Sequence, residues 1–111
     1  LATEGTLKTK VYDKIFNKNY KLFFPNHKLQ KQSVNRAIKD VKMGNVKKAA
    51  KEIQPAIKYL IKNKCKKIIL GCTELPIAIF AFKSIKTVKS SKIFLDPNLI
   101  LAYAAMKKYK N

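Results

Sequence analysis

Short apolar runs alternate with segments of helical periodicity along this chain, and this alternation restricts its fold more than any other feature. The runs 20–24 and 67–71 are typical of buried strands, and a third run at 93–95 ends at Asp96-Pro97. Strands separated by helices are joined by crossover connections, which make them parallel and cover both sheet faces with helices. The sequence therefore predicts an α/β fold with three α/β/α layers and a short, mostly parallel sheet.

Helices are expected between and after these runs, over 7–18, 27–43, 46–63, 75–82 and from the turn after Asp96 to about 109. Thr6 is a suitable N-cap for the first helix. Gly44 is a suitable C′ residue for the second, and Asn45 can cap the third. Pro55 lies inside the third helix, where it predicts a kink or a restart.

The length and composition suit one globular domain spanning residues 1–111. Apolar residues make up 47% of the chain, which is too many for a disordered tail. The sequence has no apolar run of about 18 residues, so we expect no membrane span. It also lacks a charged segment followed by an apolar one at its start, so we expect no signal peptide. We therefore expect a cytoplasmic protein with no membrane partner.

Positive charge dominates the chain, with 25 Lys+Arg against 6 Asp+Glu and a formal net charge of +19. Such a charge is the first sign of a nucleic-acid binder. However, Arg36 is the only arginine, whereas base reading and bidentate phosphate contacts favour arginine. The lysines are also spread over nearly every segment. We interpret them as a solvated surface and expect weak, salt-sensitive binding to polyanions but no specific nucleic-acid partner.

The stretch Gly71-Cys72-Thr73-Glu74 carries the strongest chemical signal. It follows an apolar run and precedes a helix, so in a parallel sheet it lies at the carboxyl end of a strand, where ligands bind. Backbone N–H groups at such a turn favour an anion such as a thiolate, and Thr73 adds a hydroxyl and an N–H for a carboxylate. A lone free cysteine is commonly just buried, but the coincidence of strand end, Gly, Thr and Glu favours a functional role.

The remaining cysteine and the only histidine are interpreted as structural. Cys65 lies between two lysines before the second strand, and we expect a half-exposed thiol. Its spacing from Cys72 fits neither a Cys-x-x-Cys redox pair nor a zinc knuckle. His27 stands at a helix start and is expected at the surface. A multi-histidine metal site is therefore ruled out, and we expect no metal.

The stretch from Leu70 to Pro76 resembles the second cysteine motif of the aspartate/glutamate racemase family. Three further stretches are similar to family motifs: Leu1–Thr6 to an Ala-Thr-x-Gly-Thr turn, Val41–Gly44 to a Val-Lys-x-Gly segment, and Leu95–Pro97 to a late Asp-Pro. These stretches follow the family's order and spacing across all 111 residues. They cover about the second half of a family chain, so the chain resembles the C-terminal lobe of a two-domain racemase.

This resemblance implies a racemase that needs no cofactor, with its active site between two similar α/β domains and an amino acid as substrate. One cysteine from each domain flanks the substrate Cα, so that one thiolate removes the α-proton while the other thiol returns a proton to the opposite face. The motif match makes Cys72 one of these two groups and places Lys42 on a substrate carboxylate. The pocket would be lined by Thr3, Gly5, Thr6, Thr73 and Glu74.

Two of these residues also have plainer interpretations. Lys42 is one of many lysines, and at a helix end it can be a solvated charge that complements the helix dipole. Glu74 can simply interact with the N-terminal N–H groups of the helix that follows it.

The opposing cysteine would come from the first half of a family chain, so the resemblance implies that these 111 residues alone do not racemise amino acids at a useful rate. In the family the last helix, here 97–109, crosses toward the other lobe. Leu99, Ile100 and Met106 would then lack cover, which predicts a homodimer, an aggregation-prone monomer or a separately encoded N-terminal half. Two non-enzymatic alternatives remain open, namely an inactive remnant of a truncated gene and a basic binding module. A third alternative keeps the fold but changes the substrate, since related enzymes of the family that the chain resembles act on hydantoins, maleate and arylmalonates.

Overall fold

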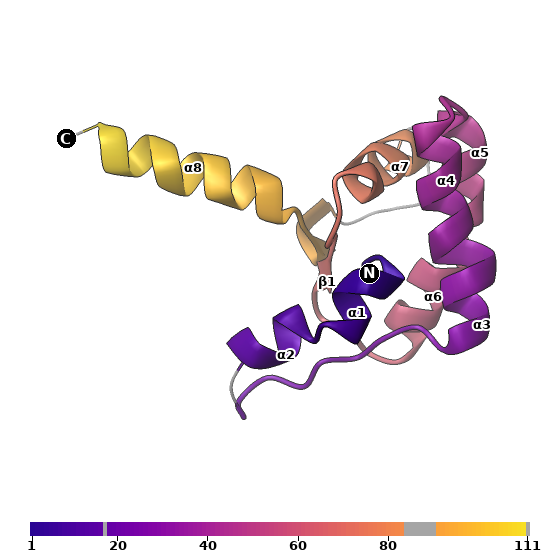
Figure 1. Ribbon diagram of the computed structural model, residues 1–111, viewed down its shortest axis with the longest axis horizontal. Coiled ribbons are helices and arrows are strands. Elements are labelled where there is room, and N and C mark those ends of the chain that lie inside the picture. The colour runs from indigo at the N-terminus through magenta and orange to yellow at the C-terminus, as the bar shows by residue number, and fades with distance from the viewer. Residues whose placement is uncertain (17, 84–90, 111) are drawn as a thin grey trace.

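The computed structural model describes residues 1–16, 18–83 and 91–110. A group of helices packs on one side of a very small parallel sheet, and the last helix projects away from this body (Figure 1). The α/β class is thus confirmed as a mostly helical chain with a short parallel sheet. The three-layer arrangement stays a prediction.

The sheet pairs β1 (Ile68–Ile69) with β2 (Phe94–Leu95) in parallel, with Ile68 opposite Phe94 and Ile69 opposite Leu95. Leu1 lies along the other edge of β1. Its backbone nitrogen donates to the Ile69 carbonyl (2.8 Å), and the Gly71 N–H donates to the Leu1 carbonyl (2.7 Å). This pattern is that of a parallel ladder. The parallel pairing is confirmed, although both strands are shorter than the runs that predicted them.

The predicted helix over 27–43 is confirmed as a continuous helical stretch. It consists of α3 (His27–Leu29), the π-helical η1 (Gln30–Asn35) and α4 (Arg36–Lys42). Gly44 follows with a φ of +81°, a left-handed conformation that suits glycine and ends the helix.

The third predicted helix is interrupted, as Pro55 indicated. It divides into α5 (Val46–Glu52) and α6 (Gln54–Lys62), and Pro55 lies in the first turn of α6, where its missing N–H costs nothing. Asn45 occupies the N-cap position of α5, but its side chain makes no capping hydrogen bond there.

The core lies where α7 (Glu74–Lys83) packs against α4 and α5. Several of its members are alanines, which let the helices approach closely. Its buried residues are Val34, Ala37, Ile38, Ala49, Ala50, Ile53, Ala56, Ile57, Leu60, Ile68, Leu70, Leu75, Ala78 and Ile79. The residues before and within α7 are thereby anchored to the core.

The single helix predicted over 7–18 is wrong. The structure has α1 (Glu4–Lys8) and α2 (Val11–Ile15), separated at Lys10, which has a φ of 52°. The Thr9 hydroxyl donates to the carbonyls of Gly5 and Thr6 (3.0 and 3.2 Å), a local bond that competes with helix continuation. The cap is also misplaced, because Thr3 rather than Thr6 caps α1. Its Oγ1 accepts from the Thr6 N–H at 3.2 Å.

The buried strand predicted over 20–24 is also wrong. These residues form neither helix nor strand, and Tyr20 is 63% exposed. Phe23 stacks on Tyr59, with ring centroids 5.8 Å apart. An apolar run becomes a strand only where a partner edge is available, and the described part of the chain pairs none with this segment.

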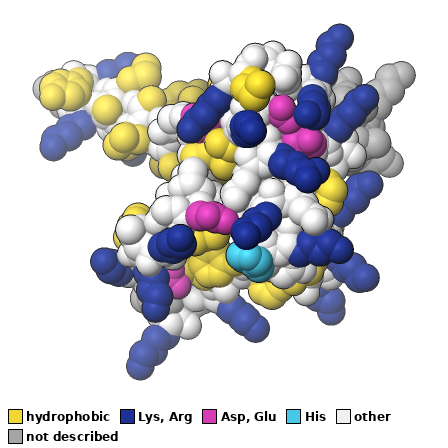
Figure 2. Space-filling model, turned by 45° about the vertical axis from the view of Figure 1, so that its right-hand side comes forward, with side chains coloured by type: hydrophobic (Ala, Val, Ile, Leu, Met, Phe, Trp, Pro, Cys, Tyr) yellow, Lys and Arg dark blue, Asp and Glu magenta, His cyan; other side chains and the backbone are white. Residues whose placement is uncertain are grey.

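The final helix, α8 (Pro97–Tyr109), agrees with its predicted range. Asp96 caps it by accepting from the N–H groups of Asn98 and Leu99 (2.9 and 3.4 Å). The helix extends into solvent, and hydrophobic side chains are visible on the projecting arm in Figure 2. Leu99, Ile100 and Met106 are all exposed, as expected, whereas the oligomeric state stays a prediction. Every described helix falls short of the length and apolar character needed to cross a membrane.

Candidate functional site

Three turns meet at the carboxyl edge of the small sheet. Leu1 pairs beside Leu70, so the turn that begins at Thr3 emerges next to the one that contains Cys72. On the other side, the Leu70 N–H donates to the Leu95 carbonyl (2.9 Å), which brings Asp96 to the same edge. Parallel pairing thus gathers three of the four stretches that resemble family motifs at the edge where α/β folds bind ligands, whereas Val41–Gly44 lies at the end of α4.

Gly71 is required where these turns come together. A Cβ there would lie 3.0 Å from the Leu1 carbonyl oxygen, 3.1 Å from the Ala2 Cβ and 3.2 Å from the Tyr12 Cε2. Such distances are tighter than ordinary contacts. Glycine therefore permits the first residues and the Tyr12 ring to lie directly against the turn that carries Cys72.

Cys72 is half-buried between β1 and α7. Burial is the main cause that raises the pKa of its thiol. The backbone N–H groups of Leu75 and Glu74 bond to the sulfur and lower this pKa, while the Glu74 carboxylate, which accepts a hydrogen bond from the thiol, raises it. The net pKa lies above the ordinary thiol value, so the Cys72 sulfur holds its proton at neutral pH.

Glu74 is half-buried, and its Oε2 accepts a hydrogen bond from the Thr73 hydroxyl at 3.1 Å. Burial alone raises the pKa of this carboxyl. Hydrogen bonds from its own N–H, Thr73 and Cys72, together with the charge of Lys42, outweigh burial and lower the pKa. Lys42 is exposed at the end of α4, which packs against α7. The structure therefore brings Cys72, Thr73 and Glu74 into contact, with the Lys42 charge close enough to act on Glu74.

The opening turn forms a separate group at the same edge. The hydroxyls of Thr3 and Thr6 are half-buried and hydrogen-bonded to each other at 3.0 Å. Gly5 is exposed, and a Cβ on it would meet only the Thr3 Oγ1, at an ordinary 3.8 Å. Packing within the described residues therefore does not demand glycine at this position.

Gln30 and Asn35 hold the opening turn against η1, and sequence reasoning missed both. The Gln30 Nε2 donates to the Ala2 carbonyl and to the Asn35 Oδ1, each at 2.9 Å. The Asn35 Nδ2 donates to the Glu4 Oε1 at 3.1 Å. Gln30 is only 4% exposed and shares the helix face of Val34. A polar residue on an apolar stripe is a signal that could have identified it.

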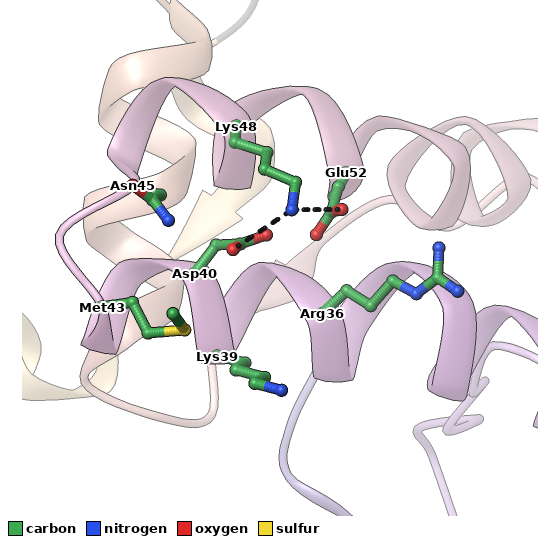
Figure 3. Close-up of a pocket in the computed structure, with 7 residues that line it drawn as sticks. All are labelled: Arg36, Lys39, Asp40, Met43, Asn45, Lys48 and Glu52. Atoms are coloured by element: carbon green, nitrogen blue, oxygen red, sulfur yellow. Dashed lines mark ion pairs between the residues drawn. The ribbon is translucent and has the colours of Figure 1, made fainter.

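A second polar group lies on the outer surface of α4 and α5, around a pocket of about 310 Å³ (Figure 3). The Lys48 Nζ lies 3.6 Å from the Asp40 Oδ1 and 3.9 Å from the Glu52 Oε1. A hydrogen bond from Glu52 is the main cause that lowers the pKa of Asp40, whereas burial and then Asp40 raise the pKa of Glu52. The two carboxyl groups therefore interact directly and join the helices. This pocket is lined by none of the candidate site residues that the sequence motifs indicated.

Cys65 and His27 lie where the sequence placed them. Cys65 is half-buried in the turn before β1, and His27 is exposed at the start of α3.

The raised pKa of Cys72 predicts slow alkylation at neutral pH. In a Cys65→Ala background, we expect the iodoacetamide rate to reach half its maximum at a higher pH than it does for free cysteine, because burial disfavours the thiolate. Glu74→Gln removes a nearby negative charge and should move this midpoint to lower pH. If the chain with Glu74 intact reaches half its maximal alkylation rate at a lower pH than free cysteine does, the N–H groups outweigh burial in setting the pKa of Cys72.

Comparisons with known proteins show what the chain is similar to. The model of the family described as Asp/Glu/Hydantoin racemase matches residues 1–105. The chain is also 35% identical over 80 residues to an uncharacterized protein in the pnlA 3′ region of Pectobacterium carotovorum subsp. carotovorum. That match covers 71% of this chain and 53% of the relative, so the chain spans about half the length of the curated relative it matches. No solved structure matches the chain.

Proposed function

The chain belongs to the Asp/Glu/hydantoin racemase family, and from this premise we propose that it is one lobe of an amino-acid racemase of the aspartate/glutamate type. The observation that carries the proposal is the position of Cys72. Its half-buried thiol lies at the carboxyl edge of a parallel sheet and bonds to Glu74, on which the Lys42 charge acts.

Cys72 is proposed as one of two acid/base groups at the substrate Cα. Because its sulfur holds a proton at neutral pH, it suits the donor role in one direction of reaction. An opposing thiolate takes the α-proton as the C–H bond breaks and its own S–H bond forms. Cys72 then gives its proton to the other face of Cα and becomes the thiolate, which the reverse reaction uses as the base. The exchange balances without a cofactor.

Positive charge is needed because the α-proton is weakly acidic and negative charge develops on the substrate as it leaves. Lys42 is proposed to bind the substrate carboxylate and to stabilise that charge. The hydroxyl and N–H of Thr73 suit the same substrate carboxylate. The Cys72 thiol donates a hydrogen bond to Glu74, and Glu74 is proposed to orient this thiol. The turn of Thr3, Gly5 and Thr6 is proposed to line the pocket from the neighbouring strand end.

A second lobe is an essential part of this proposal. One sulfur at a fixed position cannot serve both faces of Cα, so we propose that an N-terminal lobe with its own cysteine completes the site. The exposed apolar residues of α8 suit contact with such a lobe or with a second copy of the chain. A cytoplasmic location is proposed along with the small-molecule substrate.

The alternative of a basic binding module without catalysis rests on the net charge of +19. Lysine side chains are spread around the face shown in Figure 2 instead of forming one stripe. This distribution favours the racemase proposal over specific nucleic-acid binding.

Lys42→Met tests the assigned substrate contact in the two-lobe enzyme. We expect kcat/KM to fall by about 10²-fold, because a charge that stabilises the developing anion is lost. Lys39→Met, one turn earlier on α4, is the matched control and should leave kcat/KM within about twofold, because exposed charges contribute little. Equal losses in the two variants would show that Lys42 acts only through general surface charge.

A further inference from the structure

The opening turn also carries a carboxylate, that of Glu4, to which the family resemblance assigned no role. Glu4 is half-buried and begins α1 directly after Thr3, at the edge of the sheet that also carries Cys72. The chain has only 6 Asp+Glu against 25 Lys+Arg. Even so, the ion pairs of the described residues involve Asp40 and Glu52 and not Glu4. The Glu4 carboxylate is therefore available to a cationic group of a ligand.

A chain of amide groups holds this carboxylate in place. The Gln30 Nε2 donates to the Ala2 carbonyl and to the Asn35 Oδ1, and the Asn35 Nδ2 donates to the Glu4 Oε1. Neither amide can flip without placing oxygen against oxygen, so the chain ends in a donor that faces Glu4. A carboxylate has about four acceptor positions, so the bond from Asn35 leaves room for a further donor.

The cost of this network indicates a purpose beyond starting α1. Gln30 is buried, and within the described residues its Oε1 has no donor, which lowers stability. Gln30 and Asn35 are the first and last residues of η1, and π-helical turns are rare and frequent at functional sites. An acidic residue in the first turn of a helix complements the helix dipole without such support.

Lys42, the proposed contact of the substrate carboxylate, lies on the same helical stretch. Asn35 and Lys42 are seven positions apart, so they share one helix face at a separation of about 10 Å. The Glu4 carboxylate is bound at one end of this face, and Lys42 lies at the other. An α-amino acid carries both an ammonium group and a carboxylate, and these two opposite charges match that pair.

We propose that Glu4 binds the ammonium group of the substrate, and that Asn35 and Gln30 position its carboxylate for this contact. The inference rests on the proposed function and deepens it, because it requires a substrate with a free, protonated amine. Hydantoins, maleate and arylmalonates have no such group. Glu4 therefore favours amino acids over these other substrate classes.

The test measures ligand binding by the proposed two-lobe protein with Cys72→Ala, which prevents turnover. Glu4→Gln keeps an acceptor for Asn35 and removes the charge. We expect its dissociation constants for aspartate and glutamate to rise by about 10- to 100-fold, the effect of one hydrogen bond to a charged group. Succinate and glutarate are the same diacids without the amine, and they should bind at least as tightly as before. Isothermal titration calorimetry measures all four ligands.

Three further variants separate the charge from its positioning. Glu4→Asp keeps the charge on a shorter side chain and should recover part of the affinity for both amino acids. Asn35→Ala should weaken amino-acid binding only, and by less than Glu4→Gln does, because the charge remains but is no longer held. Asp13→Asn is the matched control, since it removes an exposed carboxylate from α2 and should change each dissociation constant by less than about twofold.

Equal weakening of amino acids and diacids by Glu4→Gln would show that Glu4 only shapes the turn. This result would overturn the inference and leave the proposed function intact, as would amino-acid binding that Glu4→Gln does not change. If the protein with Glu4 intact binds neither aspartate nor glutamate, the proposed function fails, and this inference fails with it.

Discussion

Cys72→Ala is expected to reduce racemisation of aspartate and glutamate by about 10²–10⁴-fold in the proposed two-lobe enzyme, because one of the two proton carriers of the proposed mechanism is lost. The matched control is Cys65→Ala, which removes the other thiol of this chain from the turn before β1. It should leave the rate close to that of the wild type. Chiral chromatography of the products, starting from each pure enantiomer, measures both variants.

The proposed mechanism also predicts how the 111-residue chain behaves by itself. It should give no stereoinversion above background, and adding an N-terminal lobe that carries a cysteine should restore activity. Stereoinversion by the isolated chain that Cys72→Ala abolishes would show that a second lobe is not needed. Restored activity that survives Cys72→Ala would show that Cys72 is not the acid/base group.

Leu75→Ala should lower the free energy of unfolding by about 2–5 kcal/mol, because it leaves a cavity in the core. Leu75 is 0% exposed and follows Glu74 in the first turn of α7. Since a domain of this size is stable by only about 5–15 kcal/mol, the loss would be a large fraction of the total. Urea denaturation followed by circular dichroism measures the change.

Ile77→Ala is the matched control, since it removes a similar aliphatic side chain from the same helix. Ile77 is 48% exposed, so its replacement should change stability by less than about 0.5 kcal/mol. Similar losses in the two variants would contradict the described packing of α7 against α4 and α5. The Leu75 N–H bonds to the Cys72 sulfur. The Leu75→Ala variant, in which the core repacks, should therefore also show an altered rate of Cys72 alkylation.

Periodicity was sufficient to predict the elements that have a buried stripe. The apolar stripe that includes Val34 and Ile38 located the long helix, and both residues are buried in the core. Pro55 located the interruption between α5 and α6, and Asp96 located the start of α8. The position of Cys72 between β1 and α7 followed from the apolar run before it. In each case the information lies within a few consecutive residues.

Features that depend on distant partners were not predictable in this way. Segment 20–24 has the composition of a strand but is not paired with one in the described chain. The network of Gln30 and Asn35 joins residues up to 31 positions apart, and Asp40 with Glu52 joins two helices. The raised pKa of Cys72 also depends on burial, which the turn sequence alone does not fix.

The most direct test of Cys72 as an acid/base group follows one enantiomer of aspartate or glutamate through the proposed two-lobe enzyme in deuterium oxide. We expect every inverted molecule to carry deuterium at Cα. We also expect Cys72→Ala to stop inversion, while the proposed opposing thiolate still exchanges the α-proton with retention of configuration. Inversion by Cys72→Ala at the wild-type rate, with the same deuterium content, would contradict the role of Cys72.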